Sequence, residues 1–461
     1  MPRQEKREPP NPASHARVVE YEEFDMSRTT DGAAIRGEIS DVLKQIEGLI
    51  DEMDIPFASQ IKEELGEMRR FLTDHRPPRL ALVGRRGSGK SSLINAIFGE
   101  QVAEVGHERA TTGEAKWWDY EGERGTIEVL DTRGFQEGSS PTQEDVADSA
   151  KESIKRALDD RPTDAVVFLT KATEVDAAIG GDIEALKELS DWLEDTYGHR
   201  PPVVAVVTHC DILEPKKVEL HNPDDFDPRD IEEKEDRVKR ITSDLKQKIR
   251  EEDELRDQLY GPIGVSAYIS WRDDGTMRYD DRWHIDRLTE YLVDELPDEA
   301  KFELARLSQV KFVQRKIANR LVHASSIVSG GIGAAPTPIA DIAPLTAVQV
   351  VMVIGIGYLS GRDLDMKAAT EFIAAMGLNA GAAFGFREAA RALVQLIPVA
   401  GNAVSGAIAY GATFGLGKAA IAYFIGDADE DEARQVFENQ RKEAADDYDD
   451  ESPDDDPEHD D

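Results

Sequence analysis

Basic residues and cysteine are scarce in this sequence. Its 461 residues include 55 lysines and arginines against 93 aspartates and glutamates, for a formal net charge of −38. A nucleic-acid scaffold needs a basic face, so this balance argues against a nucleic-acid partner. The single cysteine, Cys210, excludes a disulfide within the chain. The N-terminal stretch has charges and prolines but no apolar segment, so we expect no signal peptide.

The acidic excess indicates adaptation to salt. A carboxylate-rich surface repels itself less where the Debye length falls to ~3 Å, as it does in molar salt. We therefore expect a halophilic protein in a salt-rich cytoplasm.

One stretch has a complete phosphate-binding pattern. The apolar run Leu80–Val83 predicts a strand, G-x-x-x-x-G-K-S follows it, and an apolar-periodic helix begins at once. The glycines let backbone N–H groups surround phosphate oxygens at a helix N-terminus. We expect Lys90 to reach the β- and γ-phosphates and the Ser91 hydroxyl to bind Mg²⁺. The residues expected to contact the nucleotide here are Gly84, Arg85, Arg86, Gly87, Ser88, Gly89, Lys90, Ser91 and Ser92.

A second motif points to the γ-phosphate. The predicted strand Thr126–Leu130 runs into Asp131-Thr132-Arg133-Gly134, which is a D-x-x-G pattern. Asp131 would hold Mg²⁺ through water, and the Gly134 N–H would sense the γ-phosphate. Upstream, Thr112 is our choice for a mobile threonine that closes on Mg²⁺, with Thr111 as the alternative. The expected metal ligands are thus Ser91, Thr112 and Asp131, and the expected catalytic residues are Lys90, Thr112 and Gly134.

Two further motifs select the base. The β-branched strand Val203–Val207 leads into Thr208-His209-Cys210-Asp211, a T-x-x-D pattern. The Asp211 carboxylate would accept the guanine N1–H and the exocyclic amine together, and adenine has no such donor pair. After a last short strand, Ser266 and Ala267 would bring a backbone N–H to guanine O6.

These five motifs, in this order, resemble the Era/septin-like branch of the translation-factor class of P-loop GTPases, over about residues 79–295. The resemblance implies an α/β G domain with a mixed, mostly parallel six-stranded sheet and helices on both faces. It also implies GTP and GDP as ligands, Mg²⁺ as cofactor, and hydrolysis of the β–γ phosphoanhydride bond.

Some positions depart from the pattern of the family. Phe135 stands where Ras-like enzymes carry a water-orienting glutamine, which leaves a weakly hydrolysing GTP-binding scaffold as an alternative. Gly87 stands where potassium-dependent relatives carry asparagine. His209 replaces a lysine that usually stacks on the base. Arg85 and Arg86 are either solvent-facing or a source of finger-like charge in cis.

Composition divides the chain into five parts. Within the G domain, we expect Trp117 and Trp118 to point to opposite faces of a strand, and residues 213–261 to form a solvated insertion with a charge-rich helix. Residues 288–321 are expected to be helical with an interruption near Pro297. The expected parts are a disordered N-terminus (1–30), N-terminal helices (31–76), the G domain (77–296), an all-α Gly/Ala-rich domain (297–426) and a disordered acidic tail (427–461).

The Gly/Ala-rich region has two uncharged runs, Ile342–Gly361 and Ala392–Gly417, long enough for membrane spans. Gly357-x-x-x-Gly361 and Gly411-x-x-x-Gly415 predict close helix packing. The region resembles the helical domain of unknown function behind prokaryotic Era-like G domains and, more loosely, that of the membrane-associated immunity-related GTPases. We expect the switch to be coupled through these helices to self-assembly or to the inner face of the cell membrane, peripherally or integrally. A soluble switch with a buried bundle is the alternative. A homodimer formed by nucleotide-dependent self-assembly is compatible with either.

Overall fold

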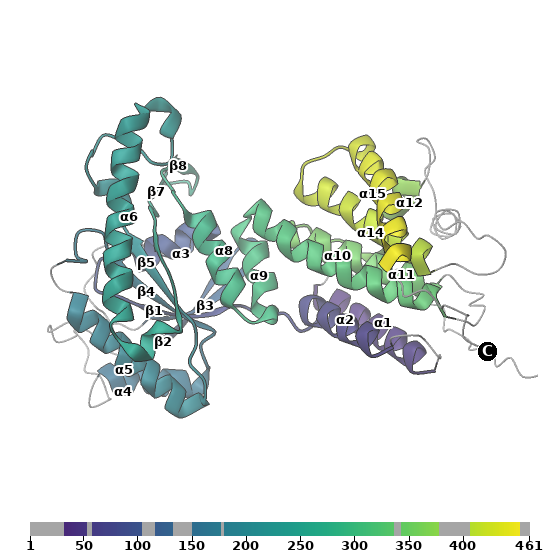
Figure 1. Cartoon of the computed structure of the whole chain (residues 1–461), viewed down its shortest axis with the longest axis horizontal. Helices are drawn as coiled ribbons and strands as arrows, with labels where there is room; N and C mark the ends of the chain where they lie inside the picture. Colours follow the sequence, from purple (N-terminus) through teal and green to yellow (C-terminus); the bar gives the residue numbers. More distant parts are fainter. Residues whose placement is uncertain are drawn as a thin grey trace, which may run out of the picture.

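The computed structural model describes residues 32–52, 58–103, 116–131, 150–176, 179–335, 343–377 and 406–451. A six-stranded sheet with helices on both faces joins a helical bundle through α8 (Ile285–Glu295) and α9 (Asp298–Ser308) (Figure 1). This confirms the predicted fold class. The domain boundaries drawn from composition stay a prediction.

The sheet has the order β2-β3-β1-β4-β5-β6. Only β2 runs antiparallel to its neighbour, so the predicted mixed, mostly parallel sheet is confirmed. The runs Leu80–Val83 and Val203–Val207 are buried throughout, as central parallel strands require. The strands are β1 (Arg79–Val83), β2 (Lys116–Gly122), β3 (Gly125–Asp131), β4 (Ala165–Lys171), β5 (Val203–Thr208) and β6 (Leu259–Gly264), with a separate hairpin of β7 (Ile269–Trp271) and β8 (Met277–Asp280).

A different set of helices covers each face of the sheet. Ala81 and Val83 of β1 belong to one apolar cluster with side chains of α4, α5 and α6, whereas Leu80 and Leu82 belong to another with α3, α8 and α9. Alternate residues of a strand point to opposite faces, so β1 supplies both cores. The helices are α3 (Lys90–Phe98), α4 (Ala150–Asp160), α5 (Ile179–Tyr197), α6 (Pro228–Arg250), the short α7 (Asp253–Arg256), α8 (Ile285–Glu295) and α9 (Asp298–Ser308).

The second cluster continues from the sheet into the bundle without a break. Helix α10 runs through the centre of the bundle and packs against α2, α11 and α14 (Figure 1). The two N-terminal helices therefore lie on the C-terminal helices. The bundle consists of α1 (Gly32–Glu52), α2 (Ala58–Leu72), α10 (Lys311–Gly333), α11 (Ala343–Leu359), α12 (Met366–Gly377), α14 (Gly406–Ala420) with a π-helical end (Ile421–Ile425), and α15 (Glu430–Glu451).

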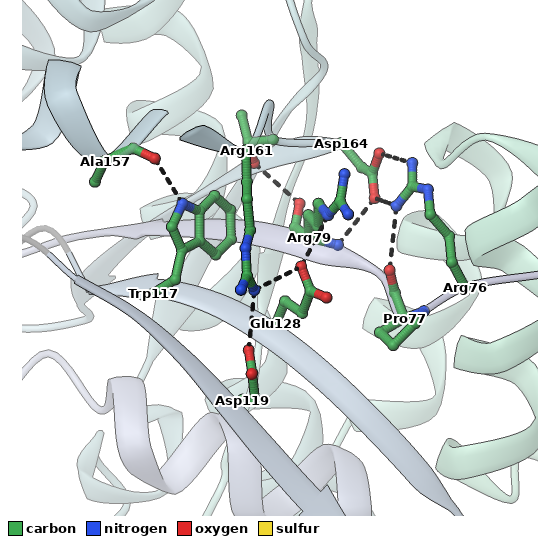
Figure 2. A network of polar contacts seen from close by, with 10 residues as sticks. Arg76, Pro77, Arg79, Trp117, Asp119, Glu128, Ala157, Arg161 and Asp164 are labelled. Atoms are coloured by element: carbon green, nitrogen blue, oxygen red, sulfur yellow. Dashed lines mark hydrogen bonds and ion pairs between the residues drawn. The ribbon is translucent and has the colours of Figure 1, made fainter. Parts of the chain in front are cut away.

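Ion pairs connect the starts of β1 and β4 with Glu128 in the middle of β3 (Figure 2). Asp164 accepts two hydrogen bonds from Arg76, at 2.7 and 2.6 Å, and one from the Arg79 backbone N–H at 2.9 Å. The Arg79 side chain donates to Glu128 at 2.8 Å, and Arg161 lies 3.4 Å from the same carboxylate. The glycine-rich loop follows the other end of β1.

The acidic tail differs most from expectation. Residues 427–461 were expected to be disordered, but Glu430–Glu451 form α15, which packs against α14. Ala433 and Phe437 are buried at helical spacing. Asp429 and Glu432 form a capping box: the Glu432 N–H donates to Asp429 at 2.9 Å, and the Asp429 N–H donates to Glu432 at 3.1 Å. A short apolar stripe with a good cap thus outweighs the charge of the tail.

The expectation of a solvated insertion at 213–261 is also wrong. Its charge-rich helix is α6, which connects β5 to β6 and packs against β6. Val238, Leu245 and Ile249 are buried, because the helix is amphipathic even though most of its residues are charged.

Three smaller expectations have mixed outcomes. Gly411-x-x-x-Gly415 packs closely against α15, as predicted. Gly361, in contrast, lies beyond the end of α11 with a φ of +85°, so Gly357-x-x-x-Gly361 does not form a helix-packing face. The 288–321 helix breaks near Pro297 as expected and again at Gln309, where φ is +54°. The Trp117 indole donates to the Ala157 carbonyl at 2.8 Å, whereas Trp118 is 39% exposed.

Candidate functional site

The glycine-rich loop joins β1 to α3 at the centre of the sheet. A Cβ on Gly84 would lie 2.5 Å from the Leu169 carbonyl oxygen of β4, so only glycine fits there. Gly87 and Gly89 have φ values of +77° and +90°, a conformation that other residues adopt at a cost. The sequence of the loop thus fixes a tight turn directly before a helix.

Lys90 and Ser91 open α3. The Lys90 Nζ donates to the Gly84 carbonyl at 2.7 Å and to the Arg85 carbonyl at 3.3 Å, so the ammonium group lies against the loop. Gly89, at the N-cap, provides no side-chain hydrogen bond to the first turn. First-turn N–H groups without a side-chain cap are typical anion ligands.

Thr208 connects the loop to the T-x-x-D segment Thr208–Asp211, which we call the base-binding motif. Its hydroxyl donates to the Ser88 carbonyl at 2.8 Å and lies 2.9 Å from the His209 Nδ1. The Ser88 hydroxyl is itself buried and has no hydrogen-bond partner among the described residues. The two motifs, 120 positions apart in the sequence, therefore form one unit at the ends of β1 and β5.

His209 lies close to the start of α3, and Cys210 is buried in the protein. A Cβ on Gly89 would lie 3.3 Å from the His209 Cε1, which places the ring under the start of α3. Burial lowers the pKa of His209, so the ring is neutral at neutral pH. Burial raises the pKa of the Cys210 thiol to about 12, which makes Cys210 a packing residue without thiolate chemistry.

Lys234 is a residue that the sequence analysis missed. It lies on α6 with its side chain buried, and its Nζ donates to the carbonyls of Asp211 and Val218 at 2.6 and 2.7 Å. Burial lowers the pKa of this lysine. The bonds fix the loop that follows Asp211, the proposed base-reading residue. In the sequence, Lys234 falls on the same side of α6 as the buried apolar residues. This pattern is hard to recognise because most residues of the helix are charged.

Ser266 and Ala267 follow β6 as expected. The Val265 N–H donates to the Val207 carbonyl at 2.8 Å, which brings this segment beside the base-binding motif. Ser266 and Trp283 exchange backbone hydrogen bonds at 3.1 and 3.0 Å. The position of this segment is therefore fixed by β5 on one side and by the start of α8 on the other.

Arg85 is bound within the protein. Its Nε and Nη2 donate to Asp182 of α5 at 3.0 and 2.9 Å. The Asp182 side chain is almost fully buried, and burial raises its pKa while Arg85 opposes that shift. The Arg85 guanidinium group thus pairs with α5 although 37% of its side chain is exposed, and Arg86 is exposed. The finger-like alternative for these two arginines stays a prediction.

Several expected site residues lie outside the described part of the chain, namely Thr111, Thr112, Gly134 and Phe135. Asp131 ends β3 and is in register with Leu82 of β1, one residue before the end of that strand. Ser91 lies in the first turn of α3, and its role as a Mg²⁺ ligand together with Asp131 stays a prediction. Among the described side chains, no group of three His, Cys, Asp or Glu residues is arranged to hold a metal ion.

Comparison with known proteins identifies the central segment. Residues 79–209 match the family model described as 50S ribosome-binding GTPase. The tRNA modification GTPase MnmE of Rickettsia akari (strain Hartford) is 27% identical over 199 residues, which cover 40% of this chain and 41% of that protein. GTPase Era of Thermoanaerobacter sp. (strain X514) is 31% identical over 149 residues, which cover 32% of this chain and 43% of that protein.

The chain thus spans about two fifths of the length of these two relatives. A solved structure with a similar part is that of Toc33 from Arabidopsis thaliana in complex with Mg²⁺ and GMPPNP. It has 18% sequence identity and a TM-score of 0.31, with coverage of 56% of this chain and 93% of that chain.

Proposed function

Because residues 79–209 form a P-loop GTPase domain of the translation-factor class, we propose that the protein binds GTP and GDP with Mg²⁺ and hydrolyses GTP as a nucleotide-controlled switch. The observation that carries this proposal is the hydrogen bond from Thr208 to Ser88, at 2.8 Å. It joins a phosphate-binding loop and a base-binding motif side by side at the ends of β1 and β5.

The roles of the residues follow from their places in that site. Lys90 and the loop amides stabilise negative charge on the β- and γ-phosphate oxygens. Mg²⁺ supplies further charge neutralisation when bound, and Ser91, Thr112 and Asp131 would hold it. Asp211 selects guanine, with Thr208, His209, Ser266 and Ala267 lining the base. Gly134 senses the γ-phosphate while water attacks in line.

Titration of the purified protein with GTP, GDP and ATP in the presence of Mg²⁺ tests the binding step. We expect both guanine nucleotides to bind far more tightly than ATP, and Lys90→Ala to lose binding while keeping its melting temperature. Equal affinities for GTP and ATP would overturn the assignment of Asp211.

We further propose that the β2–β3 hairpin transmits the nucleotide state to the bundle. The segments expected to respond to the γ-phosphate directly precede β2 and directly follow β3. The turn of the hairpin lies against α9: a Cβ on Gly125 would be 3.1 Å from the Glu303 Oε2. Glu303 is buried and accepts a hydrogen bond from Tyr358 of α11 at 2.6 Å, and it lies 2.7 Å from the His75 Nδ1. A shift of the hairpin would therefore reach α9 and α11 together.

The output of the switch lies in the bundle, for which we favour a soluble form in the cytoplasm. Helix α11 supports this, since Val348, Val351 and Val353 on successive sides of the helix are all fully buried in the protein. We expect such a switch to exchange between monomer and homodimer with the nucleotide.

Attachment to the inner face of the membrane is the second candidate. One described helix, Gly406–Ile425, is long and apolar enough to cross a membrane, and 67% of its most apolar window is buried inside the protein. Core helices of soluble proteins can have the same length and apolar composition.

Flotation with liposomes in high KCl separates the two candidates. The protein would be loaded with GDP, a non-hydrolysable GTP analogue or no nucleotide. We expect no flotation in any state. Flotation in one nucleotide state would replace the soluble switch by a membrane-acting one.

A further inference from the structure

A lysine outside the family motifs lies against the glycine-rich loop. Lys171 is the last residue of β4, and its Nζ is 3.2 Å from the position of a Cβ on Gly87. Its neighbour Ala172 donates its N–H to the Thr208 carbonyl at 2.9 Å. Lys171 therefore enters the site beside both the loop and the base-binding motif.

The base-binding motif has no positively charged side chain at His209. His209 stands where relatives carry a lysine, and the ring is neutral at neutral pH because burial lowers its pKa. In the β4–β5 pairing, Lys171 is in register with Thr208, the residue before His209. The ammonium group thus comes from the neighbouring strand at the same level of the sheet.

A purely structural role explains this position poorly. Lys171 pairs with Glu174 at 3.4 Å, but both side chains are partly exposed, at 27% and 36%, and such pairs contribute little. In a chain with a net charge of −38, a nucleotide with several negative charges needs local positive charge to bind. Lys171 is placed to provide it.

We propose that Lys171 is a nucleotide-binding residue, which supplies from the end of β4 the positive charge that the base-binding motif lacks at His209. Its ligand is the guanine nucleotide of the same site, so the inference rests on the proposed function. Both GTP and GDP would use it, since it faces Gly87 and the base-binding motif and does not depend on the γ-phosphate.

The test is the dissociation constant for GDP with Mg²⁺ in the full-length protein. We expect Lys171→Met to weaken binding about tenfold, the effect of losing one charge-assisted contact. Lys239→Met is the matched control, because it removes the same charge from an exposed position of α6 and should leave the constant unchanged. Glu174→Gln keeps the lysine and removes its partner, so binding should be as tight as in the wild type or tighter.

A double variant tests whether a lysine at position 209 can replace Lys171. His209→Lys in the Lys171→Met background returns a lysine to the motif, and we expect it to restore most of the lost affinity. Wild-type affinity in Lys171→Met, or an equal loss in Lys239→Met, would overturn the proposal. A tenfold loss in Glu174→Gln would also overturn it, because the ion pair would then be what matters. Failure of the wild type itself to bind GDP would instead refute the proposed function.

Discussion

At the scale of single residues, the candidate site combines two short motifs with lysines from other parts of the fold. The glycine-rich loop and the T-x-x-D motif are local patterns, and each follows its strand as expected. Lys171 and Lys234 reach the site from β4 and α6, and no local pattern marks them. Their contribution depends on strand order and on helix packing, which the sequence does not display.

Asp211→Asn tests the base-selecting residue. The amide presents a donor where guanine needs an acceptor, so one charge-assisted contact is lost and another weakened. We expect GTP affinity to fall by about 2 kcal/mol, or about 30-fold, while ATP affinity stays low. Calorimetric titration of both nucleotides measures this. Unchanged preference for GTP over ATP would show that another group reads the base.

Two half-buried histidines make stability depend on pH. Burial lowers the pKa of His209, and burial together with Arg287 lowers that of His284. The unfolded chain therefore binds more protons, so this stability is complete above about pH 6.5 and is lost as the pH falls. The loss is at most ~1.4 kcal/mol per pH unit for each proton.

Denaturant unfolding without nucleotide at pH 7.5 and pH 5.5 measures this dependence. We expect the wild type to be less stable at the lower pH. The double variant His209→Gln/His284→Gln should show a smaller difference. An equal difference in both proteins would assign the pH dependence to other groups.

At the scale of elements, periodicity located the helices and strands, whereas composition misjudged two of them. Helices α6 and α15 are so charged that their apolar stripes were overlooked, yet Leu245 and Phe437 are fully buried. The β7–β8 hairpin had no expectation at all, because its strands have only three and four residues. Composition alone therefore does not predict short strands or helices with a narrow apolar stripe.

Gly411→Ala tests the contact between α14 and α15. A Cβ at this position would lie 2.4 Å from the Arg441 carbonyl oxygen, so the helices must separate. We expect a loss of about 1–3 kcal/mol in the free energy of unfolding, the usual cost of overpacking. Gly48→Ala in α1 is the matched control, because nothing lies within 4 Å of its Cβ position. The control should be neutral or slightly stabilising. Equal stability of the two variants would contradict the close packing.

At the scale of the whole molecule, charge and continuity of the core are the main features. The apolar cluster that begins on one face of the sheet continues through α9 into the bundle. A continuous core allows the two parts to respond as one body. Composition predicted two separate domains but not the continuous core between them. That core depends on the packing of α9 between the sheet and α11.

The net charge of −38 predicts stability that increases with salt. Surface carboxylates repel one another, and added ions screen this repulsion at distances beyond the Debye length of ~10 Å at 0.1 M and ~3 Å at 1 M. We expect the melting temperature to rise steadily between 0.1 and 2 M KCl, followed by circular dichroism. A melting temperature that is already maximal at low salt would contradict adaptation to a salt-rich cytoplasm.

The central claim is that this protein hydrolyses GTP at the site between the glycine-rich loop and the base-binding motif. Phosphate release from GTP, measured with Mg²⁺ in molar KCl for the wild type and for Lys90→Ala, tests it most directly. The account predicts slow but multiple turnovers by the wild type and none by the variant. Tight GTP binding without any turnover would contradict it and leave a nucleotide-binding scaffold.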